Sequence, residues 1–201
     1  MIEASVRKRF SGFSLDASVS DAGFVCLAGE NGSGKTTFLR IVAGLTEPDD
    51  GYVRVNGRDL ASLPLERRGV VMVTPQSSIP SMDVERHLLW GAGLKGLRVT
   101  AERLAAVRAG LGIEFRGRVG SLSVGMRERV SLATALLSSP SAILVDEAFS
   151  NLHDREGFVS AFREFAAEGG IDVLFSSQSE TDGRLAGHLY VMERGRSTRR
   201  F

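Results

Sequence analysis

Gly29-Glu30-Asn31-Gly32-Ser33-Gly34-Lys35-Thr36 has the form of a complete G-x-x-x-x-G-K-[ST] phosphate-binding loop. It lies between the apolar run Phe24–Ala28 and a helical pattern that starts at Thr37. In a strand–turn–helix unit of this kind, the glycines allow a tight turn whose backbone N–H groups face a polyphosphate, and the helix start adds its positive dipole end. The alternative, a surface loop rich in glycine and serine, has far less support in this setting. We therefore predict that the chain binds a nucleoside triphosphate.

The side chains of the loop suit the same ligand. Lys35 can reach the β- and γ-phosphates of a nucleotide, and the Thr36 hydroxyl can hold Mg²⁺. The residues of this stretch that we predict to bind the nucleotide are Gly29, Glu30, Asn31, Gly32, Ser33, Gly34, Lys35, Thr36 and Thr37.

Composition and charge narrow the range of functions. With 201 residues, of which 43% are hydrophobic and 24% charged, the chain can bury the core of one domain. The net charge of +1 gives no reason to expect a nucleic-acid partner, and basic clusters such as Arg7-Lys8-Arg9 are typical of solvated faces. Cys26 is the single cysteine, so no disulfide forms within the chain. No stretch approaches the length of a membrane span and the N-terminus has no signal-peptide pattern, so we expect a cytoplasmic protein.

Strand-like and helical patterns alternate along the chain. Apolar residues alternate along 13–19, and short apolar runs predict strands at residues 24–28, 52–55, 70–73, 142–145, 173–175 and 189–192. Helical periodicity predicts helices at residues 37–43, 126–137 and 154–167. Phe158, Phe162 and Phe165 form an aromatic stripe on the last helix, which we expect to pack in the core.

Residues from about 80 to 121 have a different character, with helical periodicity and no strand-like run. Helices are predicted at 84–92 and at 101–110, the latter entered through Thr100 as N-cap. We therefore expect a single α/β domain over residues 1–201, with a mainly parallel central sheet flanked by helices. An N-terminal antiparallel β subdomain and a short helical subdomain at about 80–121 complete the predicted fold class, that of a P-loop NTPase.

Two acids follow the apolar run 142–145. Asp146 and Glu147 thus lie at the carboxyl end of a predicted central strand, where ligands of open α/β sheets bind. Asp146 can complete a Mg²⁺ shell, and Glu147 can polarise a water in line with a γ-phosphate, as the catalytic base. The alternative, a helix N-terminus decorated with acids, has less support because a phosphate-binding loop lies upstream.

Between the two halves of this site lies Leu122-Ser123-Val124-Gly125-Met126-Arg127-Glu128-Arg129-Val130. Here the chain resembles the ATP-binding cassette (ABC) ATPases, and the resemblance covers nearly all 201 residues. The family has a Leu-Ser-Gly-Gly-Gln signature at this distance from the acidic strand, and Ser123 and Gly125 fall on its serine and second glycine. Gln76 resembles the Q-loop residue, Ser150-Asn151-Leu152 resembles the D-loop, and Phe10 lies where the family often stacks an aromatic on adenine.

The resemblance implies a function and partners. It implies that ATP and Mg²⁺ are bound, with Thr36, Gln76 and Asp146 as metal-site residues. It also implies a head-to-tail dimer with a second ABC ATPase chain, in which Ser123 and Gly125 of one chain cap the ATP of the other. An integral membrane permease would be the further partner, so that the protein would lie at the inner face of the cell membrane and power transport. The length fits an ATPase core with no C-terminal regulatory domain.

The chain departs from the family pattern at several positions. Val124 and Met126 replace a glycine and a glutamine of the signature, and His153 replaces the aspartate that usually ends the D-loop. Where the family has a histidine that contacts the γ-phosphate, this chain has Ser177 or Gln178, depending on alignment. We expect these changes to slow hydrolysis and to affect the symmetry of the dimer, but not to prevent ATP binding.

Two other functions remain as alternatives. A soluble ABC-type switch protein would use ATP-dependent dimerisation to control an assembly without transport, and its partner would be soluble. An unrelated P-loop kinase has little support, because nothing resembles an acceptor-substrate lid and the stretch 122–130 would be unexplained.

Overall fold

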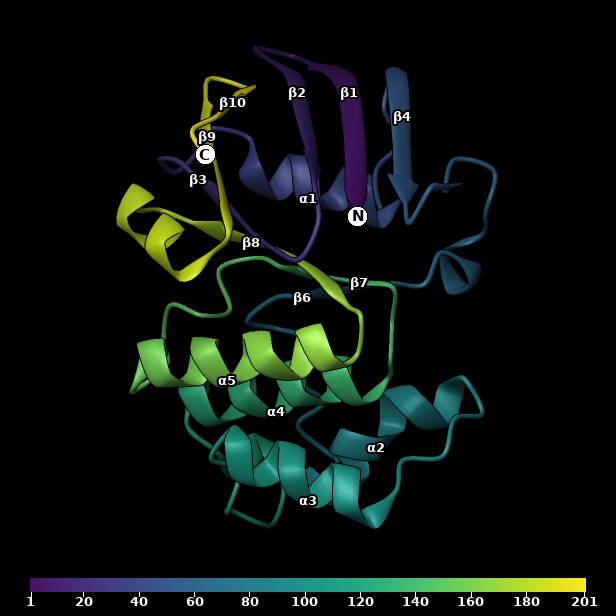
Figure 1. Cartoon of the computed structure of the whole chain (residues 1–201), viewed down its shortest axis with the longest axis vertical. Coiled ribbons are helices and arrows are strands. Elements are labelled where there is room, and N and C mark those ends of the chain that lie inside the picture. The colour runs from purple at the N-terminus through teal and green to yellow at the C-terminus, as the bar shows by residue number, and fades with distance from the viewer. The chain divides into compact units, whose positions relative to one another are not determined.

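The computed structural model describes all 201 residues and contains one ten-stranded sheet, in the strand order β5-β4-β1-β2-β10-β9-β3-β8-β7-β6 (Figure 1). The strands are β1 (Ile2–Phe10), β2 (Phe13–Asp21), β3 (Phe24–Ala28), β4 (Asp50–Val55), β5 (Arg58–Asp59), β6 (Val70–Val73), β7 (Ala142–Val145), β8 (Asp172–Ser177), β9 (His188–Glu193) and β10 (Arg196–Arg199). The helices are α1 (Lys35–Ala43), α2 (Val84–Leu94), α3 (Ala101–Gly110), α4 (Val124–Leu137) and α5 (Arg155–Glu168), with 3₁₀ turns at 65–67, 119–121 and 180–185.

The chain divides into two compact units. The sheet unit comprises Met1–Met72, Ser141–Asp146 and Asp172–Phe201, and the helical unit comprises Val73–Pro140 and Glu147–Ile171. The helical unit therefore holds α4 and α5 as well as the two helices of the insertion. None of the helices is long and apolar enough to cross a membrane.

The direction of the strands confirms the predicted fold class. β1 is antiparallel to both β2 and β4, and β4 is antiparallel to β5. β3 is parallel to β8 and β9, and β7 is parallel to β8. The N-terminal antiparallel strands and the parallel strands are thus two parts of one mixed sheet.

The core of the sheet unit follows from strand and helix periodicity. Leu15, Ala17 and Val19 of β2 are buried while the residues between them are exposed, as the alternation predicts. All five residues of β3 are buried, as is typical of a parallel strand in the middle of a sheet whose two faces are both covered. Helix α1 adds Phe38 and Leu39 to this core and ends at Gly44, whose φ of 81° lies in the left-handed region that a C-cap glycine adopts.

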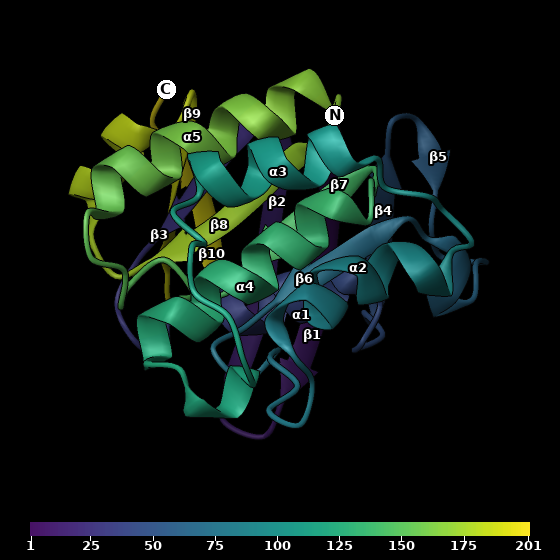
Figure 2. The ribbon, with the colours of Figure 1, turned by 90° about the horizontal axis from the view of Figure 1, so that it is seen from below.

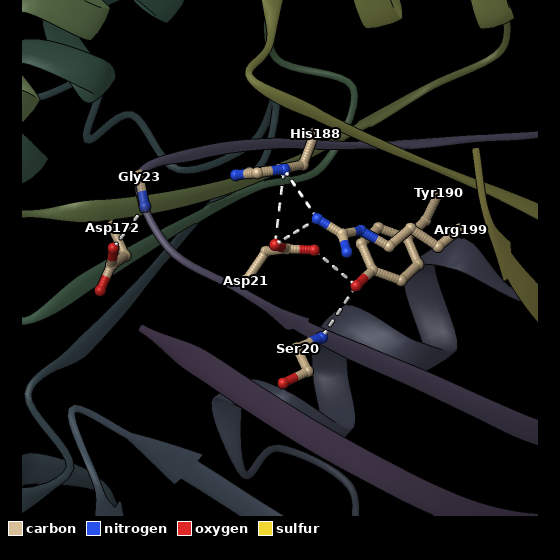
Figure 3. Close-up of polar contacts among 7 residues, drawn as sticks. All are labelled: Ser20, Asp21, Gly23, Asp172, His188, Tyr190 and Arg199. Atoms are coloured by element: carbon tan, nitrogen blue, oxygen red, sulfur yellow. Dashed lines mark hydrogen bonds and ion pairs between the residues drawn. The ribbon is translucent and has the colours of Figure 1, made fainter. Parts of the chain in front are cut away.

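A polar cluster joins β2 to the C-terminal strands (Figure 3). The buried carboxylate of Asp21 accepts a hydrogen bond of 2.6 Å from the Tyr190 hydroxyl and one of 2.9 Å from the Arg199 guanidinium, and the Nδ1 atom of His188 lies 3.4 Å away. The Tyr190 oxygen also accepts the backbone N–H of Ser20. Burial, followed by the hydrogen bond to Asp21, raises the pKa of Tyr190. Since β10 pairs with β2 at only one register position, these side chains supply contacts that the backbone ladder does not.

Helix α4 forms the centre of the helical unit and is buried from Val130 to Leu137 (Figure 2). Its neighbours are α2 and α3, and α3 also contacts α5. Gly91 of α2 allows close packing, because a Cβ atom there would lie 3.1 Å from the side chain of Ser138. The predicted N-cap of α3 is confirmed, since the Thr100 hydroxyl accepts the backbone N–H of Arg103.

The aromatic stripe on α5 is confirmed in part. Phe158 and Phe162 are buried, and their rings lie 6.4 and 5.6 Å from that of Phe149. Phe165 is only half-buried. Its ring lies against Gly110 and the guanidinium of Arg103 on α3, and not in the centre of the unit.

Candidate functional site

The loop 29–36 follows β3 directly, at the carboxyl end of the parallel strands. Its first residue is tied to the neighbouring strand, because the Gly29 N–H donates to the carbonyl of Ser177 at 3.0 Å. A Cβ atom on Gly29 would lie 2.3 Å from the carbonyl oxygen of Met192, so no larger residue fits there. The close approach of three strands thus explains the first glycine of the motif.

The last glycine of the loop starts helix α1. Gly34 is its N-cap with φ of 113°, and a Cβ atom there would lie 2.9 Å from the Phe13 ring. No side chain caps this helix end and no acidic residue lies in its first turn, so its N–H groups and positive dipole end suit an anion. The Ser33 hydroxyl nearby is buried and has no hydrogen-bond partner within the protein. A phosphate group is the ligand that these features fit best.

The ammonium group of Lys35 lies on the loop. Its side chain is buried, and Nζ donates to the carbonyl oxygens of Gly29 at 2.6 Å and Glu30 at 2.9 Å. The loop therefore curves around one positive charge, next to the start of α1.

Asp146 and the loop come together within the sheet unit. Asp146 follows β7, and its Oδ1 atom accepts hydrogen bonds from the Thr36 hydroxyl at 3.1 Å and from the Ser176 hydroxyl at 2.8 Å. A threonine hydroxyl beside a carboxylate is a donor set that suits Mg²⁺, which binds oxygen ligands and keeps water or phosphate in its remaining positions. The predicted metal residues Thr36 and Asp146 therefore fit this ion.

Ser177 is the last residue of β8 and is buried, whereas Gln178 is exposed. In the β3–β8 register Ser177 lies opposite Ala28, the residue before the loop. Its hydroxyl donates a short hydrogen bond to the carboxylate of Asp182, which is also buried. The sequence left two residues, Ser177 and Gln178, as candidates for the position of the family histidine. Of these, Ser177 lies directly beside the residue that precedes the loop.

Two phenylalanines lie near the loop in the hairpin between β1 and β2. Phe10 is 45% exposed, and its ring is stacked on that of Phe13 with 6.2 Å between the centroids. Phe13 in turn lies against Gly34. Phe10 thus offers an open aromatic face one side chain away from the loop.

Gln76 belongs to the helical unit and is exposed. The segment after it is held by the buried His87, whose Nε2 atom accepts the backbone N–H of Ile79 at 3.1 Å. The Nδ1 atom of His87 lies 2.8 Å from the Thr134 hydroxyl on α4, so Nδ1 carries the proton and donates to it. Burial lowers the pKa of His87, which favours this neutral form.

Glu147 has an unusual backbone for its residue type. It is half-buried, and its φ is 58°, in the left-handed region that a residue with a Cβ atom seldom adopts. Its carbonyl accepts the N–H of Ser150, which closes the turn after β7. Strained conformations of this kind are frequent at active sites and cost about 1–3 kcal/mol.

The predicted signature residues form the start of α4. Ser123 is the N-cap, and its exposed hydroxyl accepts the N–H of Met126 at 3.3 Å. Val124 is the first helical residue and is 47% exposed, with no positive φ. The backbone at this position is therefore compatible with a β-branched residue, and valine does not by itself strain the turn.

Gly125 lies under the predicted D-loop residues. A Cβ atom on Gly125 would lie 2.6 Å from the carbonyl oxygen of Asn151, so the close approach of the two backbones requires glycine. The side-chain amide of Asn151 donates to the buried Glu128 at 2.8 Å. Leu152 is buried, and Ser150 and His153 are exposed.

Three polar residues near these segments are absent from the sequence prediction: Ser176, Asp182 and Glu128. Each is a buried polar or acidic residue, and the sequence gives a weak signal for them, because a serine in a strand and an acid in a helix are common. The position of Ser176 one residue before the strand end, next to Asp146, is apparent only from the order of the strands.

Comparison of the sequence with known proteins finds similarity to one family. The family model described as ABC transporter matches residues 13–150. The chain is 32% identical to the spermidine/putrescine import ATP-binding protein PotA of Thermobifida fusca (strain YX), over 91% of this chain and 50% of that protein. It is 36% identical to the Fe(3+) ions import ATP-binding protein FbpC of Streptomyces avermitilis, over 90% of this chain and 55% of that protein. It is 34% identical to the molybdenum import ATP-binding protein ModC 1 of Azotobacter vinelandii, over 98% of this chain and 58% of that protein.

Solved structures show the same similarity. The structure described as the ATP binding subunit of an ABC transporter superposes with a TM-score of 0.84 and 25% identity, over 98% of this chain and 89% of that chain. A second, an ATP-binding cassette in its ADP conformation, has a TM-score of 0.78 at 22% identity and supports the fold. The chain spans only about half of the length of the curated relatives, 50–58% in the three above.

Proposed function

Because the chain belongs to the ABC transporter family, we propose that it is the ATP-binding and ATP-hydrolysing subunit of a membrane transporter. The observation that carries this proposal is the geometry of the loop 29–36. One buried ammonium, an uncapped helix start and the Thr36–Asp146 pair lie together at the carboxyl edge of the sheet, which suits Mg-ATP.

Each residue of the site has a role in binding. The N–H groups of the loop and the start of α1 bind the phosphates, and Lys35 neutralises their charge. Thr36 and Asp146 would hold the Mg²⁺ ion, with Gln76 added to this set on the family resemblance alone, and Ser176 orients Asp146 through its hydrogen bond. Phe10 stacks on the adenine with its exposed face. Bound Mg²⁺ would supply charge neutralisation on the phosphate oxygens during transfer.

Glu147 acts as the general base. Its carboxylate would accept a proton from the attacking water, and the strained left-handed backbone of the residue is a feature frequent at active sites. Ser177 cannot carry a positive charge and is already bonded to Asp182, so the transition state has no cationic donor from this position. We therefore propose that hydrolysis is slow.

The second half of each site comes from another ABC ATPase chain, in a homo- or heterodimer. Ser123 and Gly125 lie in the first turn of α4, where N–H groups can face a γ-phosphate bound to the other chain. The segment 150–152 contacts this turn from the same chain. ATP binding would thus close a head-to-tail dimer, and hydrolysis would open it.

An integral membrane permease is the third component of the proposed assembly. The outer side of α2 and the turn after it expose three large apolar side chains: Trp90, Leu94 and Leu97. Leu94 is 69% exposed, more than any other large apolar side chain of the chain, which is typical of a surface that a partner covers. We assign this surface to the permease, with the ATPase subunit at the cytoplasmic face of the membrane. The three relatives above are named as import proteins with different cargoes, so we propose import and leave the cargo to the membrane chain.

Glu147→Gln tests the composite site. The variant keeps the size of the side chain and loses the base, so we expect ATP binding with no turnover and a stable ATP-bound dimer, seen by light scattering at saturating Mg-ATP. A monomer under these conditions would contradict dimerisation of this chain with itself, and a second ATPase chain would then be required. Co-purification with a multi-span membrane protein, lost in Leu94→Glu, tests the permease contact.

A further inference from the structure

Glu128 is a buried acid with an incomplete set of partners. Its side chain is 1% exposed, and its Oε1 atom accepts the amide of Asn151 at 2.8 Å. Its Oε2 atom is also buried and has no hydrogen-bond partner. Burial of an ionised carboxylate with one unpaired oxygen would cost folding free energy, whereas a protonated acid carries no charge and avoids this cost.

Two residues of α4 contact Asn151, one at its backbone and one at its side chain. Gly125 and Glu128 are three positions apart and so lie on the same face of the helix. The Asn151 carbonyl abuts Gly125, where a Cβ atom would approach to 2.6 Å, and the Asn151 side chain reaches Glu128. The segment 150–152 is thereby placed on the first turns of α4, close in the chain to Glu147 and Ser123.

We propose that Glu128 is a positioning residue of the ATPase site, which as a neutral acid holds Asn151, and with it the turn after Glu147, against the start of α4. Neither the sequence motifs nor the family resemblance assign a role to this residue. The proposal rests on the proposed function for its enzymatic readout and on the contacts of the helical unit for its structural basis.

The surroundings of the carboxyl group support the neutral form. Burial is the largest effect and raises the pKa of Glu128, while the side-chain and backbone N–H groups of Asn151 and the charge of Arg127 lower it. Arg129, the next residue along α4, is directed to the carbonyl oxygens of Leu111 and His153 and does not neutralise Glu128. Arg127 from α4 and Asn151 from the segment after β7 are therefore the groups that act on its titration.

Two kinds of variant separate the loss of the Glu128–Asn151 contact from the loss of the titratable group at Glu128. Glu128→Gln keeps the oxygen that accepts the Asn151 amide and cannot ionise, so its turnover should stay within about threefold of the parent at the acidic end of the pH profile. Glu128→Ala and Asn151→Ala lose the contact, and a displaced site costs on the order of tenfold or more in turnover. The double variant should be no slower than the slower single variant, because both remove the same interaction.

The pH profile gives the second readout. As the pH rises through the raised pKa of Glu128, the parent loses the proton on this side chain, and its turnover should fall relative to that of Glu128→Gln. Arg127→Gln removes the charge that lowers the pKa of Glu128, so the fall in turnover should move to higher pH, while turnover at the acidic end of the profile is kept. A merely structural contact would leave the ratio of parent to Glu128→Gln constant with pH.

Thermal unfolding of the same variants separates this proposal from the proposed function. An acid whose pKa is raised by folding takes up protons on folding, so it lowers stability as the pH rises above its unfolded value. The melting temperature of Glu128→Gln should therefore exceed that of the parent by more at pH 8 than at pH 5, whether or not the chain hydrolyses ATP. Equal differences at both pH values, or full turnover in Glu128→Ala or Asn151→Ala, would overturn the role of Glu128. A parent that binds no ATP would instead overturn the proposed function.

Discussion

Replacing Ser177 with histidine should raise ATP turnover. Ser177 ends β8 beside the start of the phosphate-binding loop, and its carbonyl accepts the N–H of Gly29. An imidazolium at this position can donate to a γ-phosphate oxygen, and the buried carboxylate of Asp182, now bonded to the serine, can accept the second ring N–H. A hydrogen bond to a charged group contributes about 1.5–3 kcal/mol. If it forms only in the transition state, turnover should rise about 10- to 150-fold.

The larger side chain also has a cost. A histidine in a buried serine position overpacks its surroundings by about 1–3 kcal/mol, which for a chain of this size lowers the melting temperature by several degrees. The assay is steady-state ATPase activity at 25 °C, with ATP affinity measured in parallel and expected to change little. Gln178→His is the matched control, because residue 178 is exposed and should give no gain. A larger gain in the control, or a parent that already turns over at about ten per second, would refute the reasoning.

Three further predictions concern stability and the loop. Tyr190→Phe removes a donor from the buried Asp21 and an acceptor from Ser20, and should cost about 1–3 kcal/mol in thermal unfolding; an unchanged melting temperature would contradict the role of this cluster. Burial lowers the pKa of His87 below its usual 6.5, so at acidic pH the unfolded chain takes up a proton that the folded chain does not. The free energy of unfolding should therefore decrease as the pH is lowered below about 6.5. This loss should be smaller in His87→Gln, measured by urea unfolding at pH 7.5 and 5.5. Gly29→Ala places a Cβ atom 2.3 Å from the Met192 oxygen and should abolish binding of a fluorescent ATP analogue, whereas Gly32→Ala, with nothing within 4 Å, should retain more of it.

The elements of the proposed phosphate site could be predicted from the sequence because their signals are local. The loop 29–36 combines a motif with its flanking strand and helix, and the run 142–145 followed by two acids is equally local. Thr100 was predicted as an N-cap for the same reason, and this prediction is confirmed. The fold class follows from these elements, since parallel strands separated by helices have few other arrangements.

Contacts between residues distant in the chain could not be predicted. The pairing of Asp21 with Tyr190 and Arg199 spans about 170 positions, and no local pattern in the sequence indicates it. Glu128 and Asn151 each lie in a recognised motif, but their contact depends on how the turn after β7 folds onto α4. The sequence also offered no means to choose between Ser177 and Gln178; the structure shows that Ser177 is buried at the end of β8 and that Gln178 is exposed.

In the proposed function, the loop 29–36 binds ATP through Lys35. Equilibrium titration of the parent and of Lys35→Ala with a fluorescent ATP analogue tests it most directly, with Lys95→Ala as the matched control, because that lysine lies in the helical unit and bonds to the Ser138 carbonyl. We expect the parent and Lys95→Ala to bind the analogue with similar affinity and Lys35→Ala to lose about 100-fold or more in affinity, equivalent to about 2.7 kcal/mol. Equal affinity in all three proteins would contradict it.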